Sequence, residues 1–407
     1  MLRSMFTAIS SLNLHQYFMD VVADNLANAN TNGYKSSRIS FQDQFAQVLW
    51  NGAAPTQVLG GINPAQVGLG ARLGSISQNF TQGMLQSTGR DTDLAIQGDG
   101  FFIYANGPSQ YFSRDGILEV DSDGFLVNAG SGMRLQGWMV DASGTTVDTN
   151  EPVGSIQLPL GASVSRATSR FTLIGNLDCT TGSGASYSAT VGVYDSLGAL
   201  QSVELTFTKD ADPDTADGVT TWSWDAGTSG SGQITFDSTG QFVDSTGNIS
   251  IPGTGGANEL EITPDFSQLT QLGTGSDVAI STQDGLAAGA FSGFYVSPQT
   301  GEIIGVYSNG MQHLIGLVGL ANFVNPAGLT RMGQSMYSAG PNSGTPAIGA
   351  PNAGGRGTVA SGFVEGSNVD LGQEFTNMIL AQRGFQASSR IITTSDEMLQ
   401  ELVNIKR

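Results

Sequence analysis

The chain has 407 residues, a net charge of -19 at pH 7, 56 glycines and a single cysteine. This length suits about two to four domains, and a hydrophobic content of 39% excludes a chain that is disordered throughout. The acidic excess repels nucleic acid and anionic membranes, and the longest apolar stretch, residues 314–324, is too short to insert across a bilayer. One cysteine excludes an internal disulfide.

Residues 1–30 form the first predicted element, an amphipathic helix. Its apolar residues recur at steps of three and four, which places them along one narrow stripe. Asparagines from Asn28 onward and then Gly33 end the helix, because both residue types tolerate a left-handed backbone. Polar residues interrupt the apolar stretch, so we predict no cleavable signal peptide. The stripe consists of Leu2, Met5, Ile9, Leu12, Met19 and Leu26.

Glycine and proline organise the next part of the chain. Residues 31–66 are predicted as a connector, with strands beginning at Val67. Alternating apolar runs, separated by Asp-Gly and Asn-Gly pairs, then predict hairpins. We assign 67–145 and 285–337 to one inner β-domain.

An outer β-domain, residues 146–284, is inserted into the inner one. Between residues 171 and 330 there are 16 acidic side chains and one basic side chain, Lys209, so this region carries most of the net charge. Such a surface must face water. Alternating apolar residues predict strands at 189–195, 203–208, 221–224 and 233–236.

A second connector, 338–365, leads to a last amphipathic helix. Its stripe consists of Leu371, Phe375, Met378, Phe385, Ile392, Leu399 and Val403. Residues 1–30 and 366–407 therefore form a terminal helical domain, paired as a coiled coil, and the fold class is α+β, mainly β. Narrow, interrupted seams suit packing between helices. We expect neighbouring copies of the chain to complete them, the alternative being one antiparallel helix pair beside the β-domains.

The sequence offers little material for catalysis or metal binding. His15 and His313, the two histidines, are far apart, so no zinc site or Ser-His pair is expected. Residues 210–221 begin like a calcium loop, but Thr215 and Thr221 replace its essential Gly and Glu. We predict no enzyme, no cofactor and no metal.

A different class stays open, an extracellular glycan-binding or glycan-cleaving β-protein. Acidic side chains are abundant enough to form a catalytic carboxylate pair. Trp222 and Trp224 lie on one face of a predicted strand, where they form either a sugar platform or part of a core.

Several motifs resemble the axial proteins of the bacterial flagellum, the rod and hook family. Those near the ends are Asn25-Leu26-Ala27-Asn28, Gly33-Tyr34-Lys35, Gly366-Ser367-Asn368-Val369-Asp370-Leu371 and Ala381-Gln382-Arg383-Gly384-Phe385. Those resembling the inner β-domain include Asp93-Leu94-Ala95-Ile96 and Gly98-Asp99-Gly100-Phe101-Phe102. Those favouring hook over rod are Val193-Tyr194-Asp195-Ser196-Leu197-Gly198 and Ala321-Asn322-Phe323, together with the inserted acidic domain.

The resemblance implies a structural subunit that polymerises into the curved hook tube, a universal joint carrying torque from the rod to the filament. It implies contacts with other copies, the distal rod protein, the hook cap protein and the hook-filament junction protein. It also implies passage through the flagellar type III export apparatus to an extracellular location. The terminal helices would then fold on assembly.

Two features leave alternatives within the family. The stretch 46–66 is long for a hook and is typical of the distal rod protein, where it accompanies a straight, stiff tube. Some hooks of this family link a cysteine to a neighbour's lysine, and Cys179 lies in a comparable region, with Ser165 and Arg166 upstream of it. The only lysines of the chain are Lys35, Lys209 and Lys406.

Overall fold

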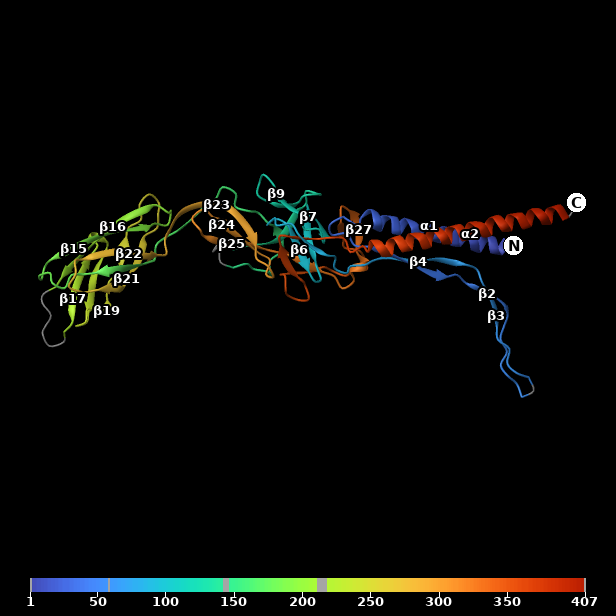
Figure 1. The fold of residues 1–407 in the computed structure, drawn as a ribbon, viewed down its shortest axis with the longest axis horizontal. Coiled ribbons are helices and arrows are strands. Elements are labelled where there is room, and N and C mark those ends of the chain that lie inside the picture. The colour runs from blue at the N-terminus through green and yellow to red at the C-terminus, as the bar shows by residue number, and fades with distance from the viewer. Residues whose placement is uncertain (1, 58, 142–145, 211–217, 406–407) are drawn as a thin grey trace. The chain divides into compact units, whose positions relative to one another are not determined.

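The computed structural model describes residues 2–57, 59–141, 146–210 and 218–405. The chain divides into two compact units. Unit 1 comprises residues 1–158, 295–304 and 314–407, and unit 2 comprises 159–294 and 305–313. The two ends of the sequence therefore belong to one unit, and the middle forms the other. Figure 1 follows the chain through its helices and strands.

Unit 1 contains two helices, α1 (Leu2–Ala27) and α2 (Leu371–Ile405), which lie side by side (Figure 1). Asp370 caps α2, since its Oδ1 accepts the backbone N–H groups of Gly372 at 2.9 Å and Gln373 at 3.1 Å. After α1 the chain turns at Gly33, whose φ is +68°. A Cβ at Gly33 would lie 2.6 Å from the backbone nitrogen of Asp115, so only glycine fits this turn.

The predicted connector at 31–66 is not free of strands. β1 (Ser37–Asp43) pairs antiparallel with β4 (Ala71–Gln78), and β2 (Ala46–Trp50) pairs antiparallel with β3 (Ala65–Gly68). Every residue of β2 is exposed. Glycines and prolines around residues 52–64 led to the expectation of a connector, but they lie between β2 and β3 and not within the paired strands.

The rest of unit 1 is a β-body. Its central order is β25-β11-β7-β8-β28-β27, and β6 pairs with β30 while β5 pairs with β31. The strands are β5 (Leu85–Ser87), β6 (Leu94–Gln97), β7 (Phe101–Asn106), β8 (Ser109–Ser113), β9 (Leu118–Val120), β10 (Leu126–Asn128), β11 (Arg134–Met139), β12 (Gly154–Ser155), β25 (Gln312–Val318), β26 (Leu320–Asn322), β27 (Thr330–Gly333), β28 (Met336–Ser338), β29 (Ala347–Gly349), β30 (Thr358–Ser361) and β31 (Phe363–Glu365), with a 3-10 turn at η2 (Pro326–Gly328).

The core of this β-body is aromatic. The ring of Phe323 packs edge-on against Phe112 at 4.8 Å and Phe101 at 5.8 Å between centroids. Phe80 and Tyr337 extend the cluster. Such pairs add to the free energy gained by burying the rings. The return segment after residue 314 thereby completes a core that begins near residue 100.

Unit 2 contains two sheets around one core. One sheet has the order β15-β16-β17-β18-β19 and the other β20-β21-β14-β22. The strands are β13 (Ser163–Arg166), β14 (Arg170–Asn176), β15 (Ser186–Tyr194), β16 (Leu200–Lys209), β17 (Thr220–Asp225), β18 (Ser231–Phe236), β19 (Phe242–Ser245), β20 (Ile249–Ile251), β21 (Leu260–Thr270) and β22 (Asp277–Gln283), with η1 at Gly227–Ser229. β23 (Leu286–Val296) and β24 (Glu302–Tyr307) contribute residues to both units.

The inward residues of both sheets form a single buried cluster that includes Trp222, Trp224 and Phe266. Alternation along β17 places both tryptophans on its buried face, each 1% exposed. They are core residues, which confirms the core alternative for this strand and excludes the sugar platform. Two paired helices with several β-sheets confirm the α+β, mainly β fold class.

Candidate assembly interface

The buried side chains of α2 are small. On α2, Ala381, Ser388 and Ser395 are buried at intervals of seven residues. The hydroxyls of Ser11 and Ser388 are 2.9 Å apart and share a hydrogen bond between the helices. Small residues allow close approach but bury little apolar area, so this contact contributes modestly to stability.

His15 faces Gly384 within this seam. A Cβ on Gly384 would collide with three atoms of the imidazole ring, so only glycine lets the ring lie against α2. Nδ1 of His15 is buried without a hydrogen-bond partner among the described residues. The histidine is thus part of the helix contact, whereas His313 belongs to unit 2.

The apolar stripe predicted from the sequence lies beside the buried seam. On α1, the buried Ala8 and Asn25 each precede a predicted stripe residue, Ile9 and Leu26, by one position, which is about 100° around a helix. Residues of the stripe are therefore half-buried or exposed. Half-buried are Met5, Leu12, Met19, Leu26, Met378, Phe385, Ile392 and Leu399; exposed are Ile9 (38%), Leu371 (46%), Phe375 (52%) and Val403 (70%). The side chain of Leu2 lies outside the described set.

Further apolar side chains are exposed on both helices and on the ribbon β1–β4. On the helices they are Phe6, Tyr17, Ile379, Leu380, Ile391 and Met398. On the strands and their connections they are Phe41, Phe45, Val48, Leu49, Trp50, Leu59, Ile62, Leu69, Leu73 and Ile76. Large exposed apolar surfaces of this kind mark sites of protein–protein contact.

A buried ion cluster lies at the base of the helices, which is the place where the chain passes between the two helices and the β-body. Lys35, eight residues after α1, donates to Oε1 of Glu365 at 2.6 Å, and Nη1 of Arg114 lies 3.3 Å from Oε2 of the same carboxylate. Lys35 also donates to the carbonyl of Thr81 at 2.7 Å, and Gly83 N–H donates to Glu365 Oε1 at 2.8 Å. Burial lowers the pKa of Lys35, and the nearby Glu365 charge partly opposes this.

Sequence reasoning missed this cluster. Its members are separated by up to 330 residues, and none of them was assigned a role from the sequence. The one available signal was the Gly33-Tyr34-Lys35 motif, in which the lysine had no assigned role. Tyr34 is bound next to it, donating to Asp24 Oδ2 and Asn25 Oδ1, each at 3.1 Å.

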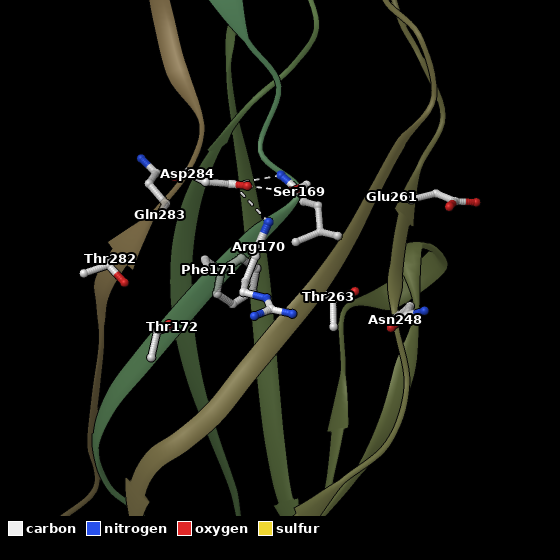
Figure 2. Close-up of a pocket in the computed structure, with 11 residues that line it drawn as sticks. Ser169, Arg170, Phe171, Thr172, Asn248, Glu261, Thr263, Thr282, Gln283 and Asp284 are labelled. Atoms are coloured by element: carbon white, nitrogen blue, oxygen red, sulfur yellow. Dashed lines mark hydrogen bonds between the residues drawn. The ribbon is translucent and has the colours of Figure 1, made fainter. Parts of the chain in front are cut away.

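Unit 2 has a polar groove lined by β14, β21 and β22 (Figure 2). Asp284 at its edge accepts hydrogen bonds from the backbone N–H groups of Ser169 at 2.9 Å and Arg170 at 3.0 Å. Burial raises the pKa of Asp284, but the bonds from Ser169 and Arg170 outweigh it and lower that pKa overall. A general acid for glycoside cleavage needs a raised pKa. This carboxylate is therefore unsuited to that role.

The remaining candidate sites add no chemistry. No group of three or more potential metal ligands gathers among residues 2–57, 59–141, 146–210 and 218–405. Most of the predicted calcium-like loop, residues 211–217, lies outside the described residues. Cys179 is half-buried and its thiol forms no disulfide. Its backbone carbonyl accepts a 2.7 Å hydrogen bond from Nζ of Lys209. No helix in the described part of the chain is long and apolar enough to cross a membrane.

Four family models match successive parts of the chain. They are described as flagella basal body rod protein (residues 5–35), flagellar hook protein FlgE/F/G D1 domain (95–169), flagellar basal body protein FlaE D2 domain (165–286) and flagellar basal body rod FlgEFG protein C-terminal (360–405). The rod models cover most of α1 and all of α2, and the match to the D2 model, residues 165–286, lies within unit 2. These matches define the class as the rod and hook proteins of the bacterial flagellum.

Full-length relatives decide between the two branches. The chain is 36% identical to the flagellar hook protein FlgE of Borreliella burgdorferi and 34% identical to that of Treponema pallidum, each over 100% of both chains. It is 30% identical to the flagellar basal-body rod protein FlgG of Bacillus subtilis, also over 100% of both chains. The chain belongs to the flagellar hook protein family.

Proposed function

We propose that this chain is a structural subunit of the flagellar hook, which polymerises into a curved tube and transmits torque from rod to filament. The observation that carries the proposal is the helix pair. The buried residues of α2, Ala381, Ser388 and Ser395, are all small, whereas large apolar residues such as Phe375 and Val403 stay exposed. A second set of helices from neighbouring copies would bury them.

This difference between small buried residues and large exposed apolar residues also supports folding of the helices on assembly. Because the buried side chains of α2, such as Ser388, are small, this helix gains little free energy from burial in the single subunit. Ordering about 60 terminal residues costs conformational entropy. The terminal helices of the monomer are therefore weakly stable, and contact with neighbouring copies supplies the missing apolar burial.

The partners follow from this role. We place the subunit between the distal rod protein and the hook-filament junction protein, with the hook cap protein at the growing end. Delivery is through the flagellar type III export apparatus, without a cleaved signal peptide, to an extracellular position. Chains with marginally stable ends suit threading through a narrow channel, because little structure has to be undone.

Electron microscopy of basal bodies from a strain lacking this chain tests the proposal. Complete rods without a curved tube or filament are expected. Shortened rods would instead assign the chain to the distal rod, the second candidate, which its exposed ribbon between β1 and β4 favours. Intact hooks and filaments would exclude both roles.

A substitution in the exposed stripe tests the mechanism. Phe375→Asp is expected to abolish polymer formation by the purified chain, because assembly would bury an unpaired carboxylate. Thr394→Asp adds the same charge at an exposed polar position of α2 and serves as the control. Polymer yield is measured by sedimentation. Equal yields for the two variants would show that the stripe is not buried in the tube.

A further inference from the structure

A groove in unit 1 is bounded by α1, the first turn of α2, β1 and β4. Two acceptor oxygens at this groove are buried and have no hydrogen-bond partner among the described residues. They are Oε1 of Gln78 and Oε2 of Glu374. A buried carboxylate oxygen without a donor is costly, so the groove is incomplete as the single subunit presents it.

Within the subunit, Asn25 and Asp370 are already hydrogen-bonded, and neither satisfies Glu374 Oε2 or Gln78 Oε1. Asn25 uses Nδ2 on the carbonyl of Ser37 at 2.8 Å and on Oε1 of Glu374 at 3.3 Å, while its Oδ1 accepts Ser37 N–H at 2.8 Å. Amides of the first turn of α2 are bound by Asp370. Arg38 lines the groove but forms no ion pair with any described carboxylate.

The helices themselves offer the complementary group. Arg383 and Arg390 each follow a buried seam residue, Ala381 and Ser388, by two positions, which is about 200° around α2. Both guanidinium groups therefore point away from α1 and toward other molecules. Arg383 donates to Gln386 within α2 at 3.5 Å. The guanidinium of Arg390 has no partner among the described residues, although it has five donors to offer.

We propose that the groove is a socket for Arg390 of a second copy of this chain. The guanidinium would donate to Glu374 Oε2 and Gln78 Oε1 together, which pairs a charge with a charge and satisfies both orphaned oxygens. The proposal rests on the proposed function, since it requires copies to pack helix to helix. It adds a polar contact that sets the register between subunits, which the apolar stripe alone does not specify.

Charge exchange between the two positions tests the socket. Glu374→Arg and Arg390→Glu are each expected to reduce the polymer yield of the full chain by roughly tenfold or more, because each leaves a buried charge without its partner. The double variant is expected to restore assembly. Glu374→Gln, which keeps the shape of the side chain, should show a smaller loss in the same direction and guards against misfolding of the arginine variant.

Arg383→Glu is the matched control, since Arg383 lies one heptad before Arg390 and on the same face of α2. Combined with Glu374→Arg it should not restore assembly. Rescue by Arg383→Glu, absence of rescue by Arg390→Glu, or single variants that assemble as the unmodified chain would each overturn the socket. If the unmodified chain itself forms no polymer, the proposed function fails instead, so the two failures are distinguishable.

Discussion

The Glu365 carboxylate is the group whose loss should weaken unit 1 most directly. Its side chain and that of Lys35 are both 0% exposed, and Arg114 is 2% exposed. Glu365→Gln keeps the shape but leaves two buried cations with no anion. One amide oxygen can still accept from Lys35 and Gly83, while the new NH2 group faces Arg114. Removing one partner of a buried ion pair costs about 3–5 kcal/mol, so we expect a loss of that size.

Hydrogen exchange measured on individual peptides by mass spectrometry, together with urea unfolding, measures this loss of stability in each unit separately. Peptides of the β-body around Lys35, Arg114 and Glu365 should lose protection, and peptides around Trp222 in unit 2 should keep theirs. A loss of about 3–5 kcal/mol is a large part of the stability of an ordinary domain. The base of the helices should therefore open before the rest of unit 1.

Arg331→Gln is the control for this experiment. It breaks the 3.1 Å ion pair between Arg331 and Asp24, in which the Arg331 side chain is 41% exposed and the Asp24 side chain 46%. Exposed ion pairs of this kind contribute about 0–1 kcal/mol to stability. The reasoning is refuted if Glu365→Gln costs no more than Arg331→Gln. It is equally refuted if protection falls to the same extent in unit 2, because the ion cluster lies entirely in unit 1.

Two further predictions concern the helices and their base. Gly384→Ala should lower helix content and polymer yield even though alanine favours helices, because the new Cβ collides with the His15 ring. Adding His15→Ala should recover both, with helix content measured by circular dichroism and polymer yield by sedimentation. A lack of recovery would contradict the contact between His15 and Gly384. Burial and the Asp24 charge raise the pKa of Tyr34 from 10.0 to about 12. Its protonated form therefore stabilises unit 1 below pH 10, and this contribution is lost as the pH rises from 10 to about 12. Thermal unfolding of Tyr34→Phe should depend less on pH in that window than the unmodified chain, and equal slopes would refute this.

Elements with a strong local pattern could be predicted from the sequence. The strand expected at 221–224 is β17 (Thr220–Asp225), and those at 203–208 and 233–236 lie within β16 and β18. Periodicity identifies a helix or strand because side-chain direction repeats along the backbone itself. The ribbon β1–β4 was missed, since its residues 37–43 pair across a gap that no local pattern reports.

The assembly interface was predictable only in part. Both terminal helices and their apolar stripe follow from the sequence, but buried positions on α1 such as Ala8 and Asn25 lie one residue away from it. Counting large apolar residues identifies the stripe, whereas close helix approach selects small ones. The unpaired oxygens of Gln78 and Glu374 were equally invisible, because their neighbours come from opposite ends of the chain.

The sequence by itself determined two terminal amphipathic helices, an inserted acidic β-region and the absence of a recognisable catalytic motif, since composition and short-range periodicity carry that information. Tertiary structure alone decided which face of each helix is left for other molecules, and that Lys35, Arg114 and Glu365 meet in one buried cluster. The physical reason is that burial and charge pairing depend on distances in space. Residues 35 and 365 become neighbours only when both ends of the chain return to the same β-body.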